Sequence, residues 1–139
     1  MYSLVYKSIA KPDFDLPKIR EMVGKARKYN QSQEITGCLL FHEGQFIQYL
    51  EGNQIKVLQL YDSIKKDSRH HTIELLAYGD IEKREFQRWT MAFKDLKGGA
   101  DNMVYLRLLV EDYVQNEKKL YLPHSPKTAF WGEIGKLMD

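Results

Sequence analysis

Hydrophobic residues follow two different periods along the first 96 residues, and these periods predict five strands and two helices. Tyr2, Leu4 and Tyr6 alternate with other residues as in a buried strand. Apolar residues at helical spacing, with Lys and Arg on the opposite side, predict an amphipathic helix over 16–29 and a second helix over 54–64. The predicted strands cover 2–6, 35–41, 45–52, 73–79 and 89–93.

The segments between these elements carry turn and cap residues. Asp15 and the early Pro17 favour a helix start, and Asn53 is a suitable N-cap for the second helix. The short polar connector 42–44 contains a glycine, which is typical of a hairpin. The polar run 30–33 predicts the end of the first helix, with Asn30 just past it as a C-cap.

The resulting order, β-α-β-β-α-β-β, predicts an α+β protein with a ferredoxin-like sheet and two helices on one face. A right-handed crossover makes the first two strands parallel, so the third strand fits between them and lies beside the first. Residues 1–96 form the expected domain, and 97–139 form a helical extension. In the extension, 97–100 predict a joint, and helices are expected near 103–110 and 130–138. An extension of this size has to pack on the domain or on a partner.

Composition limits the possible classes of protein. With 139 residues, 43% of them hydrophobic, the chain fits one globular domain and excludes general disorder. No apolar run approaches the roughly 20 residues of a membrane span, and no secretory signal is visible. The single Cys38 favours a reducing, cytoplasmic setting, and a net charge of +2 indicates neither nucleic acid nor a membrane as partner.

Three polar residues are candidates for chemistry. Gln48 shares a strand face with Phe46 and Leu50, and burying an amide without partners costs roughly 1–3 kcal/mol. Singly, the three have ordinary explanations: a satisfied or edge amide for Gln48, a packed ring for Tyr6 and a helix cap for Asn30. The topology, however, places Tyr6 beside Gln48 on the helix-facing side, with Asn30 within reach.

At these positions the sequence resembles the BLUF family, the blue-light sensors that use FAD. The resemblance covers about residues 1–96. It rests on five blocks in order: Leu4-Val5-Tyr6, Asn30 before Ile35-Thr36-Gly37, the run 44–52 around Gln48, Asp67-Ser68-Arg69-His70, and the run 84–91 that contains Trp89-Thr90-Met91.

The resemblance implies a role for each matching residue. Tyr6 resembles the tyrosine that gives an electron and a proton to excited flavin, and Gln48 the glutamine that joins it to the ring. Trp89 and Met91 match a segment thought to relay the signal. The residues implied in FAD binding are Tyr6, Met22, Ala26, Asn30, Phe46, Gln48, Ile64, Asp67, Arg69 and His70. Met22 and Ile64 would clamp the ring, although plain core packing also explains them.

Three positions depart from the family pattern. Lys7 follows Tyr6 where a small or apolar residue is usual, and alternation turns it to the other sheet face. Ser63 stands where a basic residue is common, and Ser68 replaces the proline of the turn before the histidine. The Tyr6, Gln48 and Asn30 trio is unaffected.

The sequence therefore predicts a noncovalent FAD photosensor without enzymatic activity or a metal ion, which signals through a protein partner and forms a homo-oligomer. Trp89 and the extension would carry the signal. Two alternatives share the fold. An acylphosphatase-like phosphohydrolase would need an arginine in the loop 8–15, which has none. An RNA-binding module would use exposed sheet aromatics such as Phe41, Tyr49 and Tyr78, but no glycine-aromatic RNA-binding string accompanies them.

Overall fold

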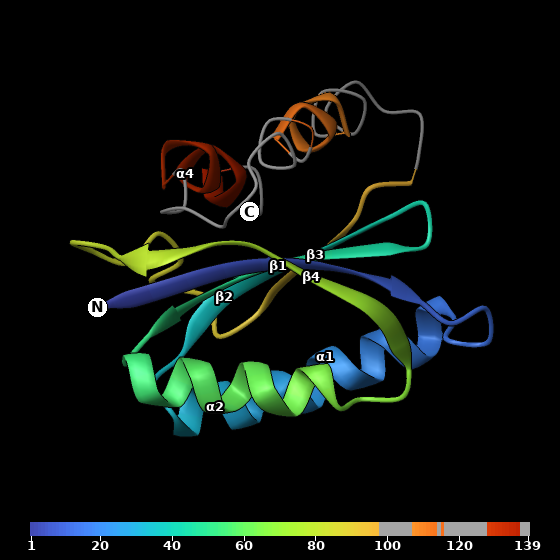
Figure 1. Cartoon of the computed structure of the whole chain (residues 1–139), viewed down its shortest axis with the longest axis horizontal. Helices are drawn as coiled ribbons and strands as arrows, with labels where there is room; N and C mark the ends of the chain where they lie inside the picture. Colours follow the sequence, from blue (N-terminus) through green and yellow to red (C-terminus); the bar gives the residue numbers. More distant parts are fainter. Residues whose placement is uncertain (98–106, 114, 116–127, 137–139) are drawn as a thin grey trace.

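The sheet is the middle of three layers in the computed structural model (Figure 1). Helices α1 and α2 cover one face, and the helical segment 107–113 and helix α4 lie over the other. The structure describes residues 1–97, 107–113, 115 and 128–136. Among these, no helix combines the length and the hydrophobicity needed to cross a bilayer.

The five strands form one sheet in the order β4-β1-β3-β2-β5. Strand β1 pairs antiparallel with β3 and β4, β2 pairs antiparallel with β3, and β5 pairs parallel with β2. The predicted ferredoxin-like arrangement, with β1 beside β3, is confirmed. The strands are β1 (Tyr2–Ala10), β2 (Thr36–His42), β3 (Gln45–Gly52), β4 (His70–Asp80) and β5 (Ala92–Asp95).

The helices begin where their caps predict and one of them ends later than expected. In α1 (Leu16–Ser32), Asp15 accepts from the Lys18 amide, and in α2 (Gln54–Lys65), Asn53 accepts from the Lys56 amide. The prediction that α1 stops at residue 29 is wrong. Asn30 lies in the last turn of α1, and its side chain is buried. This burial outweighs the polar sequence around Asn30, so the helix continues to Ser32.

The prediction of a strand starting at Trp89 is also wrong, since β5 begins at Ala92. The Trp89 amide donates to the Phe86 carbonyl across a turn. The carbonyls of Thr90 and Met91 accept from the side chains of α1 instead of from a neighbouring strand. Strands β1 and β4 are longer than predicted, because polar residues at their ends pair along the same ladder.

Each sheet face has its own hydrophobic core. The core under α1 and α2 includes Tyr6, Ile19 and Val57, and the core on the opposite face includes Val5, Cys38 and Tyr49. Strand alternation causes this division, because successive side chains of β1 and β3 point to opposite faces. The two faces are therefore buried under different elements of the chain.

The C-terminal helices contribute their own side chains to the second core. Trp131 and Ile134 of α4 (Thr128–Lys136) are fully buried, and the Trp131 ring stacks on Tyr49 with 5.1 Å between centroids. Val110 of the helical segment 107–113 joins them. The expected joint 97–100, apart from Lys97, and positions 103–106 lie outside the described residues. The boundary between a domain of 1–96 and an extension stays a prediction.

Lys7 faces this second core, as alternation predicts, but it is buried and not turned to solvent. Burial follows from the helical segment 107–113, whose residues line a hollow together with Lys7. The departure at this position is therefore a feature of the face under the C-terminal helices, away from Gln48.

Replacing Trp131 by Ala tests this packing. We expect the free energy of unfolding to fall by about 3–5 kcal/mol, because a fully buried indole leaves a cavity. Leu108→Ala is the matched control: Leu108 is 61% exposed, so its loss should cost less than about 0.5 kcal/mol. Urea unfolding followed by circular dichroism measures both. Equal effects would contradict the docking of α4 on the sheet.

Candidate functional site

A cavity of about 310 Å³ lies between α1, α2 and the sheet. Its volume is at the lower end of the range for small-molecule sites. Its walls are mostly apolar, with Met22 and Val23 from α1, Leu60 and Ile64 from α2, and Leu39 from β2. A few polar groups converge on it from the strands and from the end of α1. This combination suits a flat, largely apolar ligand with a polar edge.

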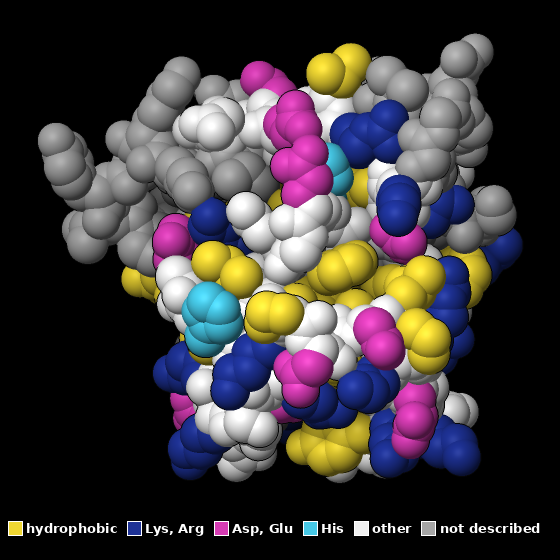
Figure 2. All heavy atoms as spheres, turned by 90° about the vertical axis from the view of Figure 1, so that its right-hand side faces the viewer, with side chains coloured by type: hydrophobic (Ala, Val, Ile, Leu, Met, Phe, Trp, Pro, Cys, Tyr) yellow, Lys and Arg dark blue, Asp and Glu magenta, His cyan; other side chains and the backbone are white. Residues whose placement is uncertain are grey.

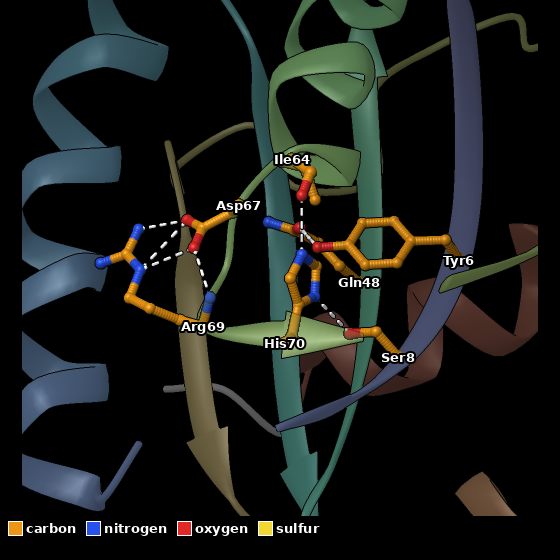
Figure 3. A network of polar contacts seen from close by, with 7 residues as sticks. All are labelled: Tyr6, Ser8, Gln48, Ile64, Asp67, Arg69 and His70. Atoms are coloured by element: carbon orange, nitrogen blue, oxygen red, sulfur yellow. Dashed lines mark hydrogen bonds and ion pairs between the residues drawn. The ribbon is translucent and has the colours of Figure 1, made fainter. Parts of the chain in front are cut away.

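Tyr6 and Gln48 face each other across the β1–β3 ladder, as predicted (Figure 3). The Tyr6 hydroxyl donates to Oε1 of Gln48, so the amide nitrogen of Gln48 points away from Tyr6. That nitrogen donates to the Met91 sulfur at 3.3 Å. Because a thioether is a weak acceptor, the donor end of this buried amide would gain from a better acceptor in the cavity.

Asn30 offers a complementary group. Its amide nitrogen donates to the Thr90 carbonyl at 2.8 Å, and its Oδ1 is buried without any hydrogen-bond partner. An unsatisfied buried carbonyl oxygen is rare and costly. A ligand edge that carries an N–H would satisfy Oδ1, and an adjacent acceptor would satisfy Gln48. An isoalloxazine ring has such an edge, with an N–H between two carbonyls, so the residues fit a flavin.

The segment 89–91 connects this cavity with the opposite face of the sheet. Met91 is buried in the core under the helices, whereas the partly buried Trp89 packs against the core under α4. Arg27 and Asn30 of α1 hold the carbonyls of Met91 and Thr90. The segment is thus bonded to cavity-lining side chains at one end and packed under the C-terminal helices at the other.

His70 forms a wall of the cavity. One ring nitrogen lies 2.6 Å from the Ile64 carbonyl and the other 2.7 Å from the Ser8 hydroxyl (Figure 3). The carbonyl can only accept, so Nε2 donates to it, and Nδ1 accepts from Ser8. The ring meets Tyr6 and Phe46 edge-on. With both nitrogens bonded to the protein, His70 serves to position α2 and β4 around the cavity.

Arg69 and Asp67 form an ion pair at the cavity rim (Figure 3). Hydrogen bonding to Arg69 holds the pKa of Asp67 below its usual value. Arg69 also lines an adjoining hollow of about 360 Å³, where Lys11, Lys18 and Lys25 outnumber the acidic groups. An anionic ligand group would be favoured in this hollow. Figure 2 shows Lys and Arg side chains, with some Asp and Glu among them, around hydrophobic side chains on the helical half of one side of the molecule.

All ten residues predicted to bind a cofactor line this one cavity. Trp89 does not line it, and Met91 does. The sequence prediction did not include seven further lining residues, which come from α1, α2, β2 and the loop before α1. They are Phe14, Val23, Lys25, Tyr29, Leu39, Leu60 and Ser63. Helical spacing of apolar residues was the available signal, but it does not separate cavity from core.

Among the described residues, three potential metal ligands also come together, which the sequence did not predict. Nε2 of His42 lies 3.1 Å from Glu111 and 3.8 Å from Glu43. The contact joins the β2–β3 turn to the helical segment 107–113. Both carboxylates are exposed, and the group lies away from the cavity.

Comparison with known proteins identifies relatives of the chain. A statistical model of one family, described as BLUF, sensors of blue-light using FAD, matches residues 1–92. The blue light- and temperature-regulated antirepressor BluF of Escherichia coli K12 is 36% identical over 95 residues, which are 68% of this chain and 24% of that protein. Photoactivated adenylate cyclase subunit beta of Euglena gracilis is 31% identical over 90 residues, which are 64% of this chain and 10% of that protein. The chain thus spans a quarter or less of these relatives.

Solved structures show the same arrangement. A bacterial light-regulated adenylyl cyclase superposes with a TM-score of 0.75 at 33% identity, over 85% of this chain and 34% of that one. BlsA in its ground state superposes with a TM-score of 0.71 at 28% identity, over 88% of this chain and 79% of that one.

The burial of Tyr6 generates a prediction on pH dependence. Burial raises the pKa of Tyr6 well above its ordinary value, and Tyr61 and Asp67 raise it further. Tyrosine in the unfolded chain ionises at about pH 10. Above that pH the unfolded state loses a proton that folded Tyr6 keeps, so the free energy of unfolding falls. At about pH 11 wild type should have lost about 1.4 kcal/mol more than Tyr6→Phe. Urea unfolding of both proteins at neutral pH and at about pH 11 measures the two losses of stability. Equal losses in wild type and Tyr6→Phe would contradict the prediction.

Proposed function

The chain belongs to the BLUF family of sensors of blue light using FAD, and from this premise we propose that it is a blue-light receptor that binds FAD noncovalently between α1 and α2. One observation carries the proposal. Tyr6, Gln48 and Asn30 converge on an apolar cavity in which one buried oxygen is unsatisfied and one buried donor has only a thioether partner.

We assign the parts of FAD by chemistry. Met22 and Ile64 would hold the isoalloxazine ring from the two helices, with Asn30 and Gln48 at its polar edge. The adjoining hollow with Lys11, Lys18, Lys25 and Arg69 suits the diphosphate, because its cations offset two negative charges. The sequence holds no glycine-rich phosphate loop, so side chains would have to do this.

Bound flavin supplies the chromophore, and in its excited state it is an oxidant strong enough to take an electron and a proton from a phenol. Tyr6 would be the donor, since it lines the cavity, its phenol is neutral and its proton already lies in the bond to Gln48. Without that proton, Oε1 of Gln48 would lack its donor, and the amide would gain by turning so that its NH₂ meets the phenolic oxygen of Tyr6. Return of the electron and the proton to Tyr6 would restore the oxidised flavin with the amide still turned.

The same turn would break the contact between Gln48 and Met91. After it, the carbonyl oxygen of Gln48 would face the Met91 sulfur, and two acceptors do not bond. Met91 belongs to the segment 89–91, which reaches the core under α4. The rearrangement therefore has a direct route to the C-terminal helices.

We infer an output by altered binding to a protein partner, without turnover by this chain. The relatives named above are an antirepressor and a photoactivated cyclase, so light sensing in this family is combined with different outputs. A light state changes partner binding only if the two states bind that partner with different affinity. The face that carries α4 is where such a difference would arise. A cytoplasmic setting and a homo-oligomer remain part of this proposal.

FAD binding is tested with Asn30→Ala. The purified chain should absorb blue light and release intact FAD on denaturation. Loss of one buried hydrogen bond should weaken FAD binding about 3- to 10-fold in titration calorimetry. Gln31→Ala, exposed in the same helix turn, is the control and should bind FAD like wild type. A chain that takes up no FAD would refute the proposal.

The photochemistry is tested with two isosteric changes. In Tyr6→Phe the ring stays but the oxidisable phenol is lost, and in Gln48→Leu no amide remains to turn. Both variants should bind FAD and lose the reversible red shift of its absorption under blue light. Tyr61→Phe is the control, because Tyr61 packs 5.5 Å from Tyr6 without bonding Gln48. A wild-type red shift in both test variants would show that the assigned residues are wrong.

A further inference from the structure

The segment 84–91 is held at both ends by different parts of the protein. Its far end, at Thr90 and Met91, is bonded to Asn30 and Gln48 of the cavity. Its near end, at Glu85 and Phe86, is bonded to Glu51 at the end of β3. The side chains of Phe86 and Trp89 pack into the core under α4. The family assignment does not say what the near end does.

Glu51 is fully buried and its carboxylate accepts four hydrogen bonds. The amides of Glu85 and Phe86 donate at 2.7 and 2.8 Å, one to each oxygen. The hydroxyls of Thr36 and Tyr49 donate at 2.7 and 3.0 Å, again one to each oxygen. The donors come from three segments of the chain, which are β2, β3 and the segment 84–91.

This arrangement requires a carboxylate at position 51. A glutamine of the same shape would have to turn its NH₂ toward one of the two backbone N–H groups, whichever way the amide is placed. A hydroxyl can rotate to accept instead, but a backbone N–H cannot. Glu51→Gln therefore leaves one buried backbone donor unsatisfied and loosens the near end.

Helix α4 packs on this near end, at Glu85 and Phe86. A Cβ on Gly132 would lie 3.0 Å from the carboxylate of Glu85, and one on Gly135 would lie 3.4 Å from the Glu85 carbonyl, so α4 packs directly on this residue. Phe86 meets the Trp131 ring at 6.4 Å between centroids. Tyr49, which donates to Glu51, stacks on the same indole.

We propose that Glu51 is a positioning residue that anchors the backbone at the near end of the segment 84–91, so that displacement of Met91 at the cavity is passed to the side chains of Phe86 and Trp89 that pack under α4. The proposal rests on the proposed function for the light step alone. With the backbone of Glu85 and Phe86 fixed, a shift at Met91 has to be taken up by Trp89 and by the side chain of Phe86, which pack in the core under α4. Without the bonds to Glu51, the backbone of Glu85 and Phe86 can move with Met91, and the side chains under α4 need not be displaced.

The test compares Glu51→Gln with Tyr49→Phe in the FAD-loaded full chain. Tyr49→Phe removes one hydroxyl donor to the same carboxylate and keeps both backbone bonds and the ring stacked on Trp131. Hydrogen exchange is measured at single amides in the dark and under blue light, together with the flavin spectrum. In the dark, the amide of Glu85 or Phe86 should exchange at least about tenfold faster in Glu51→Gln than in Tyr49→Phe.

Under light, both variants should keep the flavin red shift, because Glu51 does not line the cavity. The light-minus-dark difference in α4 should persist in Tyr49→Phe and vanish in Glu51→Gln. Equal dark exchange in the two variants overturns the anchor, and a surviving α4 difference in Glu51→Gln overturns the coupling. A wild-type chain without a red shift refutes the proposed function, while the dark comparison still decides on the anchor.

A second variant serves if Glu51→Gln does not fold. Arg84 donates to the carbonyls of Glu34 and Glu51 and to the Thr36 hydroxyl, and it is only partly buried. Arg84→Met removes the bonds beside the near end while Glu51 keeps its four donors. Because the anchor is then intact, the light difference in α4 and the red shift should both remain. Loss of the α4 difference would assign the anchoring to Arg84 and overturn the proposal.

Discussion

The hydrogen bond from the Tyr6 hydroxyl to the Gln48 carbonyl oxygen determines how the rest of the site is arranged. An amide has one donor end and one acceptor end, so a fixed partner at one end decides which way the other points. Here the donor end faces Met91 and the cavity. The β1–β3 register places the two residues opposite each other, and burial keeps the phenol neutral. Removal of one proton can therefore reverse the preferred direction of the amide.

The sheet separates this switch from the surface that has to respond to it. Each face carries its own core, so a signal has to pass around or through the strands. The segment 84–91 provides a path, since it contacts the cavity through Met91 and the C-terminal core through Phe86 and Trp89. Bonds to Asn30 and Gln48 hold one end of it, and bonds to Glu51 hold the other.

Local sequence signals were sufficient for the elements and for the polar trio. The caps Asp15 and Asn53 and the alternation around Tyr6 and Gln48 predicted two helix starts and the central strand pair. The order of elements then gave the topology, because few arrangements satisfy right-handed crossovers. The resemblance added the cavity-lining residues of α1 and α2, which spacing alone does not separate from ordinary core positions.

Features that depend on tertiary contacts were missed or misplaced. Residues 89–91 alternate like a strand, but the carbonyls of Thr90 and Met91 bond to side chains of α1, while the Trp89 carbonyl accepts from the Gly37 amide of β2. Asn30 looks like a cap because its neighbours are polar, yet burial keeps it helical. Glu51 was not singled out, since nothing in the sequence shows that donors from β2, β3 and the segment 84–91 converge on its carboxylate.

In this account, a rearrangement at the cavity displaces the side chains that pack under α4. The chain has two tryptophans, and each reports on one step: Trp89 on the connecting segment and Trp131 on α4. Fluorine NMR of the FAD-loaded, 5-fluorotryptophan-labelled chain should give two signals, which Trp89→Phe assigns. We predict that both shift under blue light and return in the dark together with the flavin spectrum. Two unmoved signals during a full flavin red shift would contradict the account.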